Sequence, residues 1–422
     1  SFAGAEKRSG NEKPAGNTLC IAKGFEAAWA FFCPAKPYVS LPTDGSVKGA
    51  AMQIYIVRPG DSLYSVARRF GTNVGQLAEI NQLSDPSRLA IGMSLVIPVG
   101  DEAARGSIEV NAYDYPNVSS EVLEETNPYL TYLCPFCYSA RADGSLAGID
   151  DERLISIARS GQTAPLMVVT NLSESSGFSS DIAHSLLTDE AAQSALLENI
   201  TAVLREKNYY GLNINFEYIY PFDRDSYSQF AARTAERMHA LGYPVSTALA
   251  PKESAEQGGL LYTAHDYAAH GQYADRVVLM TYEWGYTYGS PQAISPVNRI
   301  RRVLDYAVTV MPAGKILMGF SNYAYDWTLP WRQGQAARIL SNASAVELAI
   351  SRGAEIKYDY TAQAPWFNYT DAAGHTHVVW FEDARSVAAR LQLVDEYSLA
   401  GISIWTADKV YRPGLYVLQS MY

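Results

Sequence analysis

A carboxylate preceded by two amides at alternate positions is the feature of this sequence best suited to chemistry. Residues 209–221 read YYGLNINFEYIYP. Side chains alternate along a β-strand, so a strand here places Asn213, Asn215 and Glu217 on one face and apolar residues on the other. A carboxyl group at the end of a buried strand, among Tyr and Trp side chains, has a raised pKa because it is desolvated. Such a group can act as a general acid.

The elements that must position this strand alternate between β-type and helical patterns along residues 107–422. Apolar β-type segments are predicted at residues 108–113, 129–136, 164–171, 210–217, 244–250, 276–282, 315–320 and 401–405. Helical patterns such as DEAAQSALLENITAVLREK separate most of them. Eight such units predict an α/β fold, the (β/α)8 TIM barrel, with functional side chains at the carboxyl ends of its strands. Residues 322–382 form too long a gap for one helix and predict a small α+β insertion between strands seven and eight.

A second, much smaller pattern occupies residues 53–99, where two short apolar strands enclose two helical segments in a βααβ order. Its runs VRPGDSLYSVARRFG, LAEIN and IGMSLVIP resemble a LysM module over almost the whole length of the module. Modules of that family bind glycans that contain N-acetylglucosamine. The resemblance places the binding groove at Gly60, Asp61, Ser62 and Leu63, facing Ile91. Leu63 and Ile91 could equally be residues of the hydrophobic core. We favour glycan binding for the loop residues and a core position for the apolar stripe of the helix.

The barrel region resembles glycoside hydrolase family 18. The family signature on strand four is Asp-Gly-x-Asp-x-Asp-x-Glu, and this sequence reads YGLNINFE at residues 210–217. The runs STALAPK, LMTYEWGY, MGFSNYAYDW, VVWFEDARS and GISIW stand in the order expected of the family. Within family 18 the resemblance is greatest to the LysM-bearing N-acetylglucosaminidases of endospore formers, the spore cortex-lytic and germination type.

The resemblance implies a retaining, substrate-assisted mechanism, in which the 2-acetamido carbonyl of the sugar attacks its own anomeric carbon. Glu217 is then the acid and later the base that activates water. Tyr282 would hydrogen-bond the acetamide oxygen, and Trp405 would form the floor under the reacting sugar. Glu283 and Asp326 could bind sugar hydroxyls, or could equally be solvated charges at the rim. No cofactor is expected, because acid catalysis by a carboxyl group needs no metal.

Asn215 is the departure from the family pattern that matters most for this mechanism. The family has Asp at this position to orient the acetamide and to stabilise the positive oxazolinium ion. Asn keeps a carbonyl and an NH2 group but loses the negative charge, and losing such a preorganised contact commonly costs roughly 10²–10³ in rate. A compensated natural variant, a slow enzyme and a glycan-binding pseudoenzyme all remain open. Asn213 replaces a more remote Asp, and we expect that change to matter less.

The composition narrows the class of partner. With 44 acidic and 33 basic residues the net charge is −11, which argues against nucleic acid, since phosphate binding needs a basic surface. No stretch approaches the roughly 20 apolar residues that a membrane helix needs. The 30 Tyr and 7 Trp residues suit sugar faces, although packing in cores and interfaces would use them as well.

Three further features of the sequence have other readings. Residues 1–51 form an irregular extension whose pattern fits nothing after it. Met52 is the predicted natural start, which would leave no conventional export signal. Residues 100–106 are predicted to be a linker. Cys134 and Cys137 lie in an apolar run and are predicted to be buried, reduced thiols. The pair His375 and His377 reads as an exposed hairpin tip rather than a metal site, because no third ligand is evident.

Together these features predict a two-part protein for N-acetylglucosamine polymers. The LysM module holds the glycan and the barrel cleaves it, with peptidoglycan of the spore cortex, or its fragments, as the first choice of substrate and chitin as the second. The location expected from the resemblance is the spore coat, the cortex or the cell wall. A non-catalytic lectin of the wall or spore coat is the alternative, and Asn215 is its support. A barrel of different chemistry would need a second inward carboxylate, for which Glu283 is the obvious candidate.

Overall fold

The computed structural model describes residues 50–101, 106–173 and 177–422 of the chain. The predicted extension 1–51 lies almost wholly outside these residues, and most of the predicted linker 100–106 does too. Within them, the LysM region begins with β1 (Ala50–Ile56) and continues through α2 (Leu63–Phe70), α3 (Val74–Ile80) and β2 (Ser94–Asp101). The strands β1 and β2 pair antiparallel, which confirms the predicted βααβ order.

Capping residues determine where the LysM helices begin and end. Ser62 caps α2 by accepting a hydrogen bond from Ser65 N–H at 3.1 Å, and the Ser65 hydroxyl in turn accepts from Ser62 N–H at 3.0 Å. Gly71, with φ of 69°, ends α2 in the left-handed conformation that glycine adopts without strain. Asn73 caps α3. The helix stripe containing Val66 is buried, as predicted.

Within residues 106–173 and 177–422, eight parallel strands close into a barrel, as the sequence predicts. They are β3 (Glu109–Asp114), β4 (Tyr132–Pro135), β7 (Ala164–Thr170), β10 (Gly211–Asn215), β11 (Val245–Leu249), β12 (Arg276–Leu279), β13 (Ile316–Ser321) and β19 (Gly401–Trp405). Each strand pairs with the next in this order, and β19 pairs with β3 to close the ring. Both faces of the strands are largely buried, which explains their continuous apolar runs.

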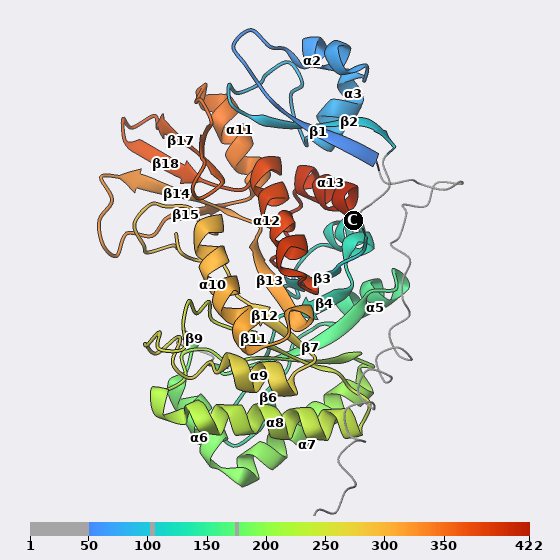
Figure 1. The fold of residues 1–422 in the computed structure, drawn as a ribbon, viewed down its shortest axis with the longest axis vertical. Helices are drawn as coiled ribbons and strands as arrows, with labels where there is room; N and C mark the ends of the chain where they lie inside the picture. Colours follow the sequence, from blue (N-terminus) through green and yellow to red (C-terminus); the bar gives the residue numbers. More distant parts are fainter. Residues whose placement is uncertain (1–49, 102–105, 174–176) are drawn as a thin grey trace, which may run out of the picture. The chain divides into compact units, whose positions relative to one another are not determined.

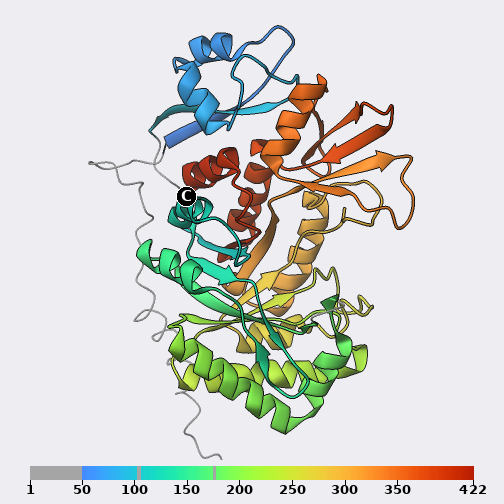
Figure 2. The ribbon, with the colours of Figure 1, turned by 180° about the vertical axis from the view of Figure 1, so that it is seen from behind.

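Helices surround the barrel, and α6, α7 and α8 lie close together on its outside in both views (Figure 1 and Figure 2). The helices are α4 (Ser120–Thr126), α5 (Glu152–Ser160), α6 (Ser180–Thr188), α7 (Glu190–Glu206), α8 (Arg224–Ala240), α9 (Tyr267–Tyr273), α10 (Val297–Val310), α12 (Ala384–Tyr397) and α13 (Arg412–Met421). Short connecting elements are η1 (Asn127–Tyr129), β5 (Tyr138–Ala140), β6 (Leu146–Ala147), β8 (Leu172–Ser173), β9 (Gly177–Phe178), η2 (Pro221–Asp223) and η3 (Ala313–Lys315). None of the described helices is both long and apolar enough to cross a membrane.

The predicted insertion between β13 and β19 is a small antiparallel sheet with one helix. Its elements are β14 (Ala324–Leu329), β15 (Arg338–Leu340), α11 (Asn342–Arg352), β16 (Lys357–Asp359), β17 (Ala364–Thr370) and β18 (Thr376–Trp380). The strand order is β15-β14-β18-β17-β16, so β14 is paired on both sides, with β15 and β18. Side chains alternate along β14, so Tyr325 and Trp327 face one side and Asp326 the other.

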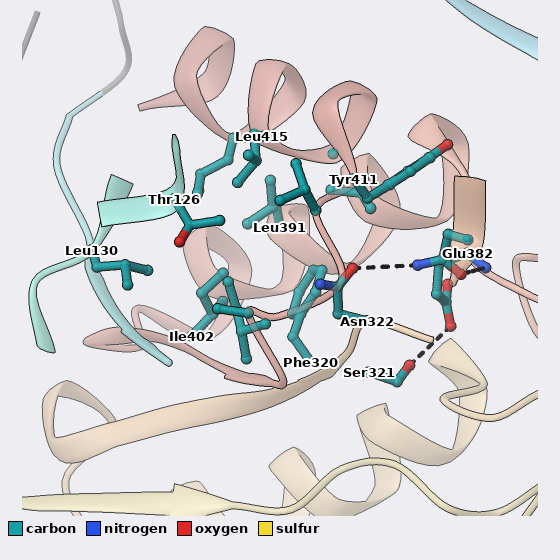
Figure 3. A pocket seen from close by; sticks show the side chains of 17 residues that line it. Thr126, Leu130, Phe320, Ser321, Asn322, Glu382, Leu391, Ile402, Tyr411 and Leu415 are labelled. Carbon is teal, nitrogen blue, oxygen red and sulfur yellow. Dashed lines mark hydrogen bonds between the residues drawn. The ribbon is translucent and has the colours of Figure 1, made fainter. Parts of the chain in front are cut away.

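A buried ion pair fixes the two ends of this insertion to the barrel. Glu382, just after β18, accepts from Arg390 of α12 at 2.7 Å and from the Ser321 hydroxyl at the end of β13 at 3.0 Å. Arg390 is fully buried and also donates to the Ser295 carbonyl at 2.7 Å. Figure 3 shows Glu382 and Ser321 beside a cavity of about 50 Å³ that Leu391 and other apolar side chains also line. These bonds hold both insertion ends against α12.

Replacing Arg390 by Met tests the contribution of this pair to stability. Removing one partner leaves Glu382 buried without its counter-charge, so we expect the free energy of unfolding to fall by roughly 3–5 kcal/mol. Chemical denaturation monitored by circular dichroism measures the loss. The matched control is Arg301→Met, whose partner Glu396 lies at the surface, where a pair contributes roughly 0–1 kcal/mol. Equal losses in the two variants would contradict the role assigned to the buried pair.

Candidate active site

The inward face of β10 carries the two amides of the sequence motif, and Asn213 is the deeper of them. It is fully buried. Its Oδ1 accepts from the Tyr113 hydroxyl at 3.0 Å, and its Nδ2 donates to the Ser246 hydroxyl at 2.8 Å. Asn213 thus joins β3, β10 and β11 through the barrel interior. These partners make it a bridge within the barrel, below the level of Glu217.

Asn215 lies one layer nearer the rim and has a different environment. Its side chain is 3% exposed, and its amide hydrogen-bonds the Glu217 carboxyl group. Its Oδ1 is buried and has no hydrogen-bond partner among the described residues. A buried acceptor without a donor is costly, roughly 1–3 kcal/mol, so this oxygen is suited to a ligand that brings an N–H or O–H group.

Glu217 follows the last residue of β10 by two positions and is held in a desolvated site. Its pKa is raised to about 7, chiefly by burial, while the hydrogen bond from Asn215 lowers it and the charge of Glu283 raises it. A carboxyl group with this pKa is substantially protonated at neutral pH and can donate a proton. These properties suit Glu217 to the general-acid role, which stays a prediction from the sequence motif.

Glu283 is tied to the insertion rather than left in solvent. Its carboxylate accepts hydrogen bonds from the hydroxyls of Tyr323 and Tyr325, the latter at 3.0 Å, and these bonds lower its pKa while burial raises it more. Its backbone has φ of 67°, an uncommon conformation for a side chain larger than glycine. Backbone strain of this kind clusters at functional sites. The insertion strand β14 thus fixes a second carboxylate whose charge acts on Glu217.

Aromatic rings form an apolar surface beside the acid. Trp405, at the end of β19, lies 4.9 Å from Phe136, 5.5 Å from Tyr113 and 6.0 Å from Tyr115, measured between ring centroids. Tyr282 and Trp405 both pack against the buried aromatic cluster of Tyr323, Tyr325 and Trp327. Burial and the charges of Glu217 and Glu283 raise the pKa of Tyr282 well above its ordinary value, so its hydroxyl stays protonated and can donate. The structure brings Glu217, Asn215, Tyr282, Glu283 and Trp405 to the same end of the barrel.

Asp326 lies apart from this group, on the opposite face of β14 from Tyr325. It is 4% exposed, and its carboxylate accepts from Arg338 at 2.9 Å and Tyr369 at 2.8 Å. His377 Nδ1 lies 2.9 Å from the other oxygen, so protein groups engage both carboxylate oxygens. His375 is at the exposed tip and pairs with Asp371. Asp326 and the two histidines form a network within the insertion sheet.

Several side chains of this site were not predicted from the sequence. Asp114 ends β3, is fully buried, and has one carboxylate oxygen without a hydrogen-bond partner among the described residues. Burial and the neighbouring Asp408 raise its pKa to about 7. Its position at the end of the first barrel strand was the available signal. Tyr323 and Tyr325 lie in the run MGFSNYAYDW, but the run does not give their role, which depends on how the insertion folds against Glu283.

The proposed LysM groove residues divide by burial. Leu63 is 1% exposed and belongs to the core, which decides between the two readings that the sequence left open. Ile91 is 42% exposed, and its carbonyl accepts from Ile356 N–H of the insertion at 2.9 Å. The Asp61 carboxylate accepts from Arg58 N–H and from the Tyr55 hydroxyl, both at 2.7 Å, and so stabilises the turn. Gly60, Asp61, Ser62 and Ile91 remain candidates for glycan contact.

The two described cysteines are free, buried thiols, as predicted. Cys134 donates to Asn111 Oδ1 at 3.1 Å inside the barrel, and Cys137 lies 3.3 Å from the Thr170 hydroxyl. Burial raises the pKa of both thiols, so neither is a reactive thiolate at neutral pH. Cys20 and Cys33 lie outside the described residues.

Comparison with known families and proteins agrees with this architecture. Residues 159–409 match the family profile "Glycosyl hydrolases family 18", and residues 55–98 match the LysM domain profile. The chain is 46% identical over 407 residues to the "Cortical fragment-lytic enzyme" of Bacillus subtilis (strain 168), a match that covers 84% of this chain and 94% of that protein.

Two solved structures extend the likeness. The spore cortex-lytic enzyme SleL of Bacillus megaterium QM B1551 superposes with a TM-score of 0.85 at 33% identity, covering 89% of this chain and 99% of that one. A chitinase from Chromobacterium violaceum ATCC 12472 superposes with a TM-score of 0.69 at 26% identity, covering 75% of this chain and 99% of that one. Both matches extend over nearly the whole length of the compared chain.

Titration of the Glu217 carboxyl group by carbon NMR tests the electrostatics of the site. We expect a pKa of about 7, assigned by the disappearance of the signal in Glu217→Gln. The protonated form should predominate below that pH and be lost as the pH rises through it. Glu283→Gln removes the neighbouring negative charge and should lower the pKa of Glu217, whereas the surface variant Glu396→Gln should leave it unchanged. A Glu217 pKa near the ordinary value of 4.5 would contradict this description.

Proposed function

Because the chain belongs to glycosyl hydrolase family 18 and carries a LysM domain, we propose that it hydrolyses peptidoglycan of the spore cortex and its fragments. The bond cleaved is the β-1,4 linkage that follows N-acetylglucosamine. The likeness over most of both chains to a cortical fragment-lytic enzyme and to a spore cortex-lytic enzyme supports this substrate. The corresponding location is the spore cortex, the coat or the cell wall.

The unpartnered Oδ1 of Asn215 is the single observation that carries the mechanism. An N-acetylglucosamine unit in the site has an acetamido N–H, which is the donor that this buried oxygen lacks. The Asn215 amide also hydrogen-bonds Glu217, so one side chain can orient both the acid and the acetamide. Asn therefore retains the orienting role of the usual Asp and gives up only its negative charge. An Asn215 that can orient both groups favours a working enzyme over a pseudoenzyme.

The remaining groups follow from the chemistry of a substrate-assisted reaction. Glu217 donates its proton to the leaving glycosidic oxygen, while the acetamide oxygen attacks the anomeric carbon and forms an oxazolinium ion. The Tyr282 hydroxyl donates to that acetamide oxygen, and Trp405 supports the apolar face of the sugar. Glu217, now a carboxylate, takes a proton from the water that opens the ring, which restores the acid and retains the β configuration. Glu283, held by its two tyrosines, offers an anion for sugar hydroxyls and for the oxazolinium charge.

The LysM domain contributes to this function by tethering. Binding of the domain to the same polymer raises the local concentration of linkages at the barrel without any new contact in the active site. Two alternatives remain. The loss of the Asp charge at position 215 favours a non-catalytic lectin, and the likeness to a chitinase structure favours chitin as substrate.

Mass analysis of muropeptides released from purified spore cortex tests the proposal. We expect products with reducing N-acetylglucosamine ends from the wild type and a loss of about 10²–10⁴-fold in rate in Glu217→Gln, because the proton donor is absent. Asn215→Asp should still cleave, and chitin oligomers serve as the parallel substrate.

The outcome for the natural enzyme separates the alternatives. Faster cleavage of chitin oligomers than of cortex would indicate that chitin, and not cortex peptidoglycan, is the substrate. Binding of both glycans without cleavage, with activity appearing only in Asn215→Asp, would establish the lectin and overturn the proposed hydrolase.

A further inference from the structure

The sheet does not hold the backbone of Glu217. Pairing of β10 with β7 ends at Asn215 opposite Thr170, and pairing of β10 with β11 ends at Ile214. The next residue, Tyr218, has φ of 55° and turns the chain out of the strand direction. The peptide groups on either side of Glu217 therefore need partners from outside the β-ladder.

Asn171, which directly follows β7, supplies partners on one side. Its Oδ1 accepts from Glu217 N–H at 2.9 Å, and its Nδ2 donates to the Glu217 carbonyl at 2.8 Å. The second Nδ2 hydrogen goes to the Ser179 carbonyl at 3.0 Å. The side chain is fully buried. A side-chain amide thus takes the place of the neighbouring strand and grips both backbone groups of Glu217.

His265 supplies the partner on the other side. Its Nδ1 accepts from Ala250 N–H at 2.7 Å, so the proton of the neutral ring is on Nε2. Nε2–H donates to the Phe216 carbonyl at 3.0 Å, which belongs to the same peptide group as Glu217 N–H. Burial lowers the pKa of His265 to about 4, so the ring is neutral at neutral pH and this tautomer is maintained. Asn171 and His265 therefore hold one peptide group at its two ends.

We propose that Asn171 and His265 are positioning residues, which fix the Cα–Cβ direction of Glu217 so that its carboxyl group meets the glycosidic oxygen. The inference rests on the proposed role of Glu217 as the acid. Neither side chain needs to touch the substrate, because both act through the backbone of Glu217. Misplacement of a reacting group by about 1 Å is enough to cost on the order of 10²-fold in rate.

Kinetics of Asn171→Ala, His265→Ala and His265→Gln on a soluble fluorogenic N-acetylglucosamine oligomer test the proposal. We expect kcat of Asn171→Ala to fall by about 10–100-fold while KM stays within about threefold, since only the acid is displaced. Gln can place an amide N–H where His265 has Nε2–H, so His265→Gln should recover part of the kcat that His265→Ala loses. Far-ultraviolet circular dichroism and active-site titration normalise each rate to folded enzyme.

Asn81 of the LysM domain provides a matched control. Its Oδ1 accepts from Val96 N–H at 2.7 Å and its Nδ2 donates to the Val96 carbonyl at 2.9 Å, the same two-point grip as that of Asn171. Asn81→Ala should leave kcat on the soluble substrate unchanged.

Two different failures can be told apart. A wild type that cleaves neither the fluorogenic oligomer nor spore cortex would defeat the proposed function itself, and a wild type that cleaves only cortex allows the same variants to be compared on cortex fragments. An active wild type whose kcat per folded molecule is kept in Asn171→Ala and His265→Ala would overturn only the positioning role. If Asn171→Ala does not fold, the comparison of His265→Gln with His265→Ala decides, and equal kcat values in those two variants would likewise overturn it.

Discussion

Desolvation at the mouth of the barrel raises the pKa of Glu217 to about 7, and most of the surrounding structure acts on this one carboxyl group. The barrel strands bury it, Asn215 hydrogen-bonds it, and Glu283 opposes its ionisation. Asn171 and His265 hold its backbone beyond the end of β10. A protonated, oriented acid can therefore exist at neutral pH without the Asp that family 18 usually places at position 215. The negative charge of Glu283 contributes to this raised pKa.

The insertion belongs to the same arrangement. The hydroxyls of Tyr323 and Tyr325 reach Glu283, and the charge of Glu283 reaches Glu217. Under the proposed function the position of β14 matters for the chemistry, and the buried pair of Glu382 and Arg390 helps to fix that position at the insertion's ends. The ion pair of Glu382 and Arg390 is thus connected to Glu217 through the insertion, whose tyrosines hold Glu283. The apolar cavity beside Glu382 lies on the outer side of β19, away from Trp405.

Much of this could be predicted from the sequence, because apolar β-type segments, helical patterns and the strand-four motif are local signals. Those signals predicted the eight strands, the insertion and the LysM order, and the alternation along β10 placed Asn215 beside Glu217. The motif does not determine where β10 ends. The hydrogen bonds from Asn171 to the backbone of Glu217 could therefore not be predicted from it. The partners Asn171, His265 and Tyr325 come from distant segments and are set by barrel closure and by the insertion's fold, which no short pattern encodes. The burial of Leu63 required the three-dimensional packing of the LysM domain.

In the proposed mechanism the substrate, and not a second protein carboxylate, supplies the nucleophile. The most direct measurement is the rate of cleavage of fluorogenic N-acetylglucosamine glycosides whose acetamide carries zero, one, two or three fluorine atoms. Each fluorine withdraws electron density from the acetamide oxygen, so the account predicts that kcat/KM falls steadily along the series. A kcat/KM that does not change along the series would contradict the account and would indicate that a carboxylate such as Glu283 attacks the sugar.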